Sequence, residues 1–220
     1  MEENPYIMLM MQHFEMDYCV HDLSVSDICA RYHVSEALFI TVANLYNGIK
    51  PKSRIDFSEN DVLQMVRFLK NSHNYYREDK YPQISSYIRQ LQENHSEKEL
   101  KLLEKFFNEY FTEVLEHLDY EDNVAFPYFI SLLKHGENGD RSDYVYSSKE
   151  YSEHHTDIEL KLKDLKNLLL KYVKINGDLN RRRKLFYALF ELEYDLYIHS
   201  LIEETILIPL GASIESGHHA

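Results

Sequence analysis

Two copies of one motif place an imidazole and a carboxylate at helical spacing. His117 and Glu121 are four residues apart, and so are His199 and Glu203, with 82 positions separating the two histidines. In both copies another acidic residue follows the glutamate directly, and a proline stands six positions after it. Residues four apart on an α-helix lie one above the other on the same face. Each motif can therefore present a nitrogen and an oxygen ligand to one transition-metal ion.

A single histidine precedes each motif at the same distance. His73 lies 44 residues before His117, and His155 lies 44 residues before His199. Helical phase also selects His155, because it falls on the apolar face of its helix while its neighbour His154, which is left open as a substitute, is offset by about 100°. The two copies supply four imidazoles and two carboxylates. That is the ligand inventory of a dinuclear metal centre.

Four long helices are expected to position these residues. Apolar spacing, capping residues and turn signals predict helices at about 58–92, 97–134, 148–174 and 178–209, with a kink at Pro82. Short loops between them favour antiparallel neighbours in an up-down-up-down bundle. Each histidine lies about 21 or 22 residues from its turn, at a rise of about 1.5 Å per residue. The sequence therefore predicts all four imidazoles in one layer.

Composition and charge limit the class of protein. The 220 residues include only 6 Gly and 5 Pro, which favours an all-α fold, with a small helical N-terminal domain at 1–50 and the bundle at 58–210. The net charge of −13 argues against nucleic acid as a partner. Cys19 and Cys29 cannot form a disulfide framework and fit a reducing compartment. Without a signal peptide or a membrane-length apolar segment, we expect a cytoplasmic protein with no membrane partner.

The ligand types indicate which metals suit the centre. Mixed imidazole and carboxylate ligands fit iron, manganese or zinc. The set contains no thiolate, which would favour a softer metal. Carboxylates that can bridge two ions favour iron or manganese. The acids that follow the two motifs, Asp122 and Glu204, are rotated away from the histidines and are expected outside the ligand set.

Residues 58–210 resemble the haemerythrin-like cation-binding domain, whose signature is H…HxxxE…H…HxxxE on a four-helix bundle. The resemblance rests on HNYYRED at His73, HLDYEDNVAFPY at His117, EHHTDIE at His155 and HSLIEETILIPL at His199. It implies a carboxylate-bridged pair of iron ions, in preference to manganese or zinc. The metal ligands that it implies are His73, His117, Glu121, His155, His199 and Glu203.

The spacing is also similar to that of the bacterial iron–sulfur cluster repair (repair-of-iron-centres) family. The segment Asp17-Tyr18-Cys19 resembles the start of the adjacent Cys-Cys motif in that family's small N-terminal domain, but Val20 replaces the second cysteine. The resemblance implies repair of iron–sulfur clusters or a response to nitrosative or oxidative stress. It implies O₂ or NO as small ligands and iron–sulfur proteins as partners.

The N-terminal block supports a second interpretation. Residues 24–48 resemble a helix-turn-helix in spacing, but the second helix carries no arginine or lysine to contact DNA, which favours a docking or dimerisation module. The alternative function is therefore a regulatory protein that senses O₂, NO or redox state and signals through its N-terminal helices. Metal storage without turnover is a third option. The oligomeric state is left open, a homodimer included.

Overall fold

The computed structural model describes residues 3–51, 57–95, 98–135, 156–171 and 177–215. Within these ranges the chain is helical and contains no strand, which confirms the predicted all-α class. The candidate ligands His154 and His155 lie outside the described residues, as does the start of the helix predicted at 148–174. None of the helices in the described ranges has the length and apolar content needed to cross a bilayer.

The chain divides into two compact units, and the boundaries that fall in described residues lie inside helices. The first unit combines residues 1–72, 122–153 and 198–220, and the second combines residues 73–121 and 154–197. One boundary falls between Ser72 and His73, which are consecutive residues of a single helix. The division expected from the sequence, 1–50 and 58–210, is a different one and stays a prediction.

Three short helices form the N-terminal part of the first unit: α1 (Ile7–His13), α2 (Val25–Tyr32) and α3 (Glu36–Tyr46), with α1 and α2 both packed on α3. A capping box between Ser24 and Asp27 begins α2, and His33, in the left-handed region at φ 56°, ends it. Cys19 is exposed, whereas Cys29 is buried on α2. Burial, with a smaller contribution from a nearby glutamate, raises the pKa of the Cys29 thiol.

Helix α4 (Glu59–Tyr75) follows and contacts these short helices. Ser58 and Asp61 form a capping box at its start: the Asp61 amide donates to Oγ of Ser58 at 3.2 Å, and Oδ2 of Asp61 accepts from the Ser58 amide at 2.9 Å and its hydroxyl at 2.7 Å. Burial alone would raise the pKa of Asp61, but hydrogen bonds from the Ser35 and Ser58 hydroxyls outweigh it and hold the pKa below its usual 3.8. Further along α4, Asn71 Nδ2 donates to the carbonyl of His13 at 2.9 Å. The N-terminal helices are therefore hydrogen-bonded to α4 at the residue next to Ser72.

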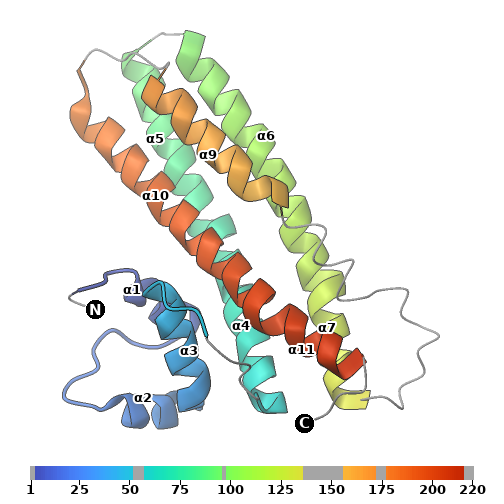
Figure 1. Cartoon of the computed structure of the whole chain (residues 1–220). Helices are drawn as coiled ribbons and strands as arrows, with labels where there is room; N and C mark the ends of the chain where they lie inside the picture. Colours follow the sequence, from blue (N-terminus) through green and yellow to red (C-terminus); the bar gives the residue numbers. More distant parts are fainter. Residues whose placement is uncertain (1–2, 52–56, 96–97, 136–155, 172–176, 216–220) are drawn as a thin grey trace. The chain divides into compact units, whose positions relative to one another are not determined.

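Four helical stretches correspond to the four predicted helices (Figure 1). They are α4 with α5 (Tyr81–Asn94), α6 (Lys98–Tyr120) with α7 (Phe126–His135), α9 (Thr156–Lys171), and α10 (Leu179–Ile202) with α11 (Ile208–Glu215). In the second unit α5 packs on α6 and α6 packs on α9, while α7 packs on α11 in the first unit. The apolar positions at the centre of the second unit are completely or almost completely buried: Ile84, Leu91, Leu100, Leu103, Phe107, Leu162, Leu165 and Leu189.

Three π-helical segments interrupt these stretches: η1 (Tyr76–Lys80), η2 (Glu121–Ala125) and η5 (Glu203–Leu207). Each ends two residues before a proline, namely Pro82, Pro127 and Pro209. Proline has no N–H, so the carbonyl four residues before it loses its α-helical donor. In each case that carbonyl belongs to the central residue of the π segment. The kink predicted at Pro82 is therefore one of three proline-linked π turns.

Candidate metal centre

Glu121, the first residue of η2, lies between two imidazoles of the second unit. Its Oε1 atom is 2.8 Å from Nε2 of His117, and its Oε2 atom is 3.1 Å from Nε2 of His73. The side chains of His73 and Glu121 are completely buried, and that of His117 is 15% exposed. One carboxylate thus presents each of its oxygens to a different histidine, away from bulk water.

His199 and Glu203 make the matching contact in the first unit. Nε2 of His199 is 3.2 Å from Oε1 of Glu203, and both side chains are buried. On the other side of the ring, Nδ1 of His199 is 2.8 Å from Oγ of Ser72. Nε2 of His199 therefore faces an oxygen ligand candidate, and Nδ1 faces a hydroxyl.

The hydroxyl of Ser72 fixes which nitrogen of His199 carries the proton. Oγ of Ser72 is 2.7 Å from the carbonyl oxygen of Leu69, which can only accept. The single hydroxyl proton is used in that bond, so Oγ must accept from Nδ1–H of His199. Neutral His199 then has its lone pair on Nε2, the atom that faces Glu203. This is the tautomer that a metal bound at Nε2 requires.

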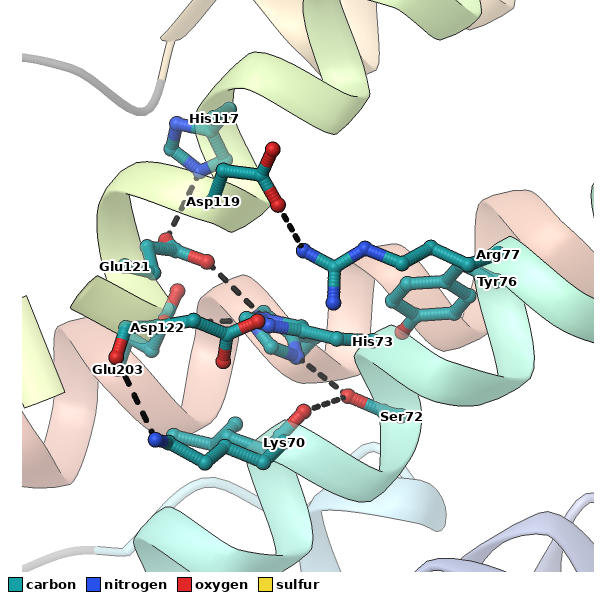
Figure 2. Close-up of polar contacts among 12 residues, drawn as sticks. Lys70, Ser72, His73, Tyr76, Arg77, His117, Asp119, Glu121, Asp122 and Glu203 are labelled. Atoms are coloured by element: carbon teal, nitrogen blue, oxygen red, sulfur yellow. Dashed lines mark hydrogen bonds and ion pairs between the residues drawn. The ribbon is translucent and has the colours of Figure 1, made fainter.

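Ser72, which contacts His199, and His73, which contacts Glu121, are consecutive residues of α4. One ligand atom from each of His73, Glu121 and His199 lies within 4.8 Å of the other two. Two ligands of one ion, each bonded at about 2.0–2.2 Å, can be at most about 4.4 Å apart. Figure 2 shows Glu121 between His117 and His73, with one carboxylate oxygen toward each ring.

Polar contacts between α4–η1 and α10 continue beyond the candidate centre. The Tyr76 hydroxyl donates to Oδ2 of Asp195 at 2.9 Å, and Nζ of Lys80 lies 2.6 Å from Oε1 of Glu191. Ser72, Tyr76 and Lys80 follow one another at intervals of four residues. Their partners His199, Asp195 and Glu191 follow at the same interval in the reverse order along α10. Burial and a 2.5 Å hydrogen bond to Glu191 also raise the pKa of Tyr75 well above its usual range. Within the second unit, side-chain contacts therefore hold η1 against α10.

The structure describes five of the six predicted ligands. It groups His73, Glu121 and His199, and it puts His117 and Glu203 in contact with members of that group. His155 lies outside the described residues. Glu204 is exposed, and the backbone oxygen of Asp122 lies 3.4 Å from Nζ of Lys70.

The sequence interpretation missed the side chains that hold the ligands in place. Ser72 and Asp195 are both buried and lie close to predicted ligands in the chain. A signal for Asp195 exists, since Glu191, Asp195, His199 and Glu203 follow one another at intervals of four and form one polar stripe on α10 and η5. Ser72 carries no such signal.

The sequence matches no protein-family model and no curated protein. The haemerythrin-like resemblance therefore stays a prediction.

The metal-binding chemistry of the site can be judged from its donors. Two imidazoles and a carboxylate, all buried, form a donor set that suits iron, manganese or zinc. Buried carboxylates are costly unless a positive charge lies beside them, and a bound metal ion would supply one. The residues present fit a metal ion.

Proposed function

We propose that this chain is a non-haem di-iron protein of the haemerythrin-like class, built on an up-down-up-down four-helix bundle. The observation that carries the proposal is Glu121, whose two oxygens each face a different imidazole. A carboxylate that bridges two metal ions uses one oxygen for each ion, so this arrangement suits a dinuclear site better than a mononuclear one. The choice of iron rests on the resemblance, with manganese and zinc as alternatives.

The proposed ligands divide into imidazoles and bridging carboxylates. The imidazoles are His73, His117, His155 and His199, and the carboxylates are Glu121 and Glu203. Iron bound there would supply reversible one-electron chemistry and a position open to O₂ or NO. The chain's own residues would orient the site: Ser72 keeps the proton of His199 on Nδ1, and complete burial of the Glu121 side chain limits its access to water.

The physiological role that we propose is repair of iron–sulfur clusters, or a response to nitrosative or oxidative stress, in the cytoplasm. The ligand spacing and the Asp17-Tyr18-Cys19 segment support this role through their resemblance to the repair family. Exposure of Cys19 is compatible with a contact to a client iron–sulfur protein.

A second candidate function is sensing, and a specific contact favours it. Asn71 stands directly before Ser72 and His73, and its side-chain amide is hydrogen-bonded to the carbonyl of His13 in α1. A change in metal ligation that moved this part of α4 would reach the N-terminal helices through that bond. Such a protein would change its partner binding or oligomeric state with O₂ or NO.

Metal analysis and absorption spectroscopy of protein expressed and purified without oxygen test the di-iron proposal. We expect two irons per chain and, after oxidation, the spectrum of a bridged diferric pair. Glu121→Ala should abolish that spectrum, whereas Glu109→Ala, which removes an exposed glutamate from the same helix α6 as His117, should preserve it. Wild-type protein without stoichiometric iron, or Glu121→Ala with unchanged iron, would refute the proposal.

Two further measurements separate the candidate roles. If the protein repairs clusters, its loss should slow recovery of iron–sulfur enzymes after nitrosative stress. If it is a sensor, Asn71→Ala should abolish an NO-dependent change in partner binding or oligomeric state while leaving the iron content unchanged.

A further inference from the structure

Helix α10 has one buried apolar side and a second side where leucine and aromatic side chains stand beside two arginines. Leu185, Leu189 and Leu192 form the buried side. A second set follows the helical spacing i, i+3, i+4, i+7, i+8 and i+11 toward solvent: Leu179, Arg182, Arg183, Phe186, Tyr187 and Phe190. A helix that is apolar on opposite sides is normally covered on both.

The second set lines a groove with a volume of about 430 Å³, to which α9 contributes Leu170. Leu170 is 61% exposed, Leu179 is 73% exposed and Tyr187 is 65% exposed. Lys166 of α9 places its ammonium group 5.0 Å above the ring of Phe190, at one side of this groove. Exposed aromatic and arginine side chains around one concave surface are typical of the central part of a protein interface.

The charge at this groove is opposite to that of the chain as a whole. Arg181, Arg182, Arg183 and Lys184 are consecutive in a chain whose net charge is −13. They also stand in the first turns of α10, where the positive end of the helix dipole disfavours cations. Nη1 of Arg181 lies 2.7 Å from Oδ2 of Asp178, and Arg182 and the exposed Arg183 line the groove. A groove lined by arginines in a chain of net charge −13 is complementary to an acidic partner.

We propose that this groove binds an amphipathic helix of a partner protein, with aspartate or glutamate residues flanking the helix's apolar face. The stripe spans eleven residue steps, or about 17 Å at 1.5 Å per residue, which suits a helix laid lengthwise. Acidic flanks would meet Arg182 and Arg183, while the apolar face would cover Tyr187 and Phe190. A second copy of this chain is disfavoured as the occupant, because two chains of charge −13 repel each other. The surface is independent of the metal proposal.

Fluorescence anisotropy with the full chain and a labelled helical peptide tests this surface. The probe carries leucine at i, i+3, i+4 and i+7 with glutamate on both flanks, and its matched control carries lysine in place of glutamate. We expect saturable binding of the glutamate peptide and at least about tenfold weaker binding of the lysine peptide.

Two double variants with the same change of charge locate the binding. Arg182→Glu/Arg183→Glu should weaken the glutamate peptide at least about tenfold, whereas Lys101→Glu/Lys105→Glu on the exposed side of α6 should weaken it much less. Tyr187→Ser should weaken binding even at high salt, where screening removes most of the charge contribution. Circular dichroism of each variant checks that the fold is retained.

Four results would overturn the proposal. The first is equal binding of the two peptides, and the second is wild-type affinity in Arg182→Glu/Arg183→Glu. The third is a chain that self-associates and becomes monomeric in Tyr187→Ser, which would make a second copy the occupant. The fourth is binding of duplex DNA, but not of the peptide, through the same arginines.

Discussion

Replacing Ser72 with alanine should weaken metal binding while leaving every proposed ligand in place. The hydroxyl of Ser72 accepts the Nδ1–H of His199 at 2.8 Å and so presents Nε2 as a ligand. In Ser72→Ala, a metal on Nε2 would leave the buried Nδ1–H without its acceptor. Without metal, His199 can avoid that cost by moving its proton to Nε2, beside Glu203. The penalty therefore falls mainly on the metal-bound state.

The expected size of the effect follows from the contact. Leaving a buried N–H donor unsatisfied costs about 1–3 kcal/mol. Since about 1.4 kcal/mol corresponds to a tenfold change in a binding constant, metal affinity should fall about 5- to 150-fold. That range includes the loss of about 10- to 100-fold that is typical when the hydrogen-bond partner of a metal-binding histidine is removed.

Competition with a chromophoric chelator for Zn²⁺ measures the affinity without redox chemistry. Ser72→Thr keeps the hydroxyl and should bind metal more tightly than Ser72→Ala. Ser86→Ala removes the same atom from an exposed position on α5 and should bind metal as the wild type does. An affinity of Ser72→Ala within about twofold of wild type would refute the assignment of the His199 tautomer.

Three other predictions concern the rest of the molecule. A thiol reagent should modify Cys19 quickly in the native protein and Cys29 only on unfolding, because Cys29 is buried and its thiol pKa is raised; two equally fast thiols would contradict this. Because folding lowers the pKa of Asp61, the ionised carboxylate contributes stability above pH 3.8 that is lost as the pH falls below it. The difference in urea midpoint between Asp61→Asn and wild type should therefore shrink on acidification, and a constant difference from pH 6 to pH 3 would count against it. Tyr76→Phe leaves the buried Asp195 without a hydroxyl donor and should lower the free energy of unfolding by about 1–3 kcal/mol, with an unchanged urea midpoint as the contrary result.

Local spacing predicted the features that depend on local geometry. The contacts from His117 to Glu121 and from His199 to Glu203 are both i,i+4 contacts, and the structure contains both. Counting residues from the turn predicted His73 level with His117, and the structure puts both imidazoles against Glu121. These features need only the rise of a helix and the position of a turn.

Contacts between distant residues could not be predicted in this way. Ser72 and His199 are 127 positions apart, and nothing in the spacing of serines indicates which hydroxyl will face an imidazole. The π turns were missed for a different reason. Pro127 and Pro209 were recognised as parts of a repeat, but a proline can bend, end or widen a helix, and neighbouring packing decides between these outcomes.

The π turns separate two tasks within single helices. A π turn adds about one residue to an α-helix, so everything beyond it is rotated by about 100° relative to an uninterrupted helix. Glu121 and Glu203 stand at the first position of their π segments, and the packing helices α7 and α11 begin directly after those segments. The direction in which the carboxylate points is thereby independent of the helix face that buries Phe126 and Ile214. Loss of one residue from η5 would turn Ile214 out of its packing while leaving His199 and its contacts upstream unrotated, so the ligand half and the packing half of one helix can vary independently.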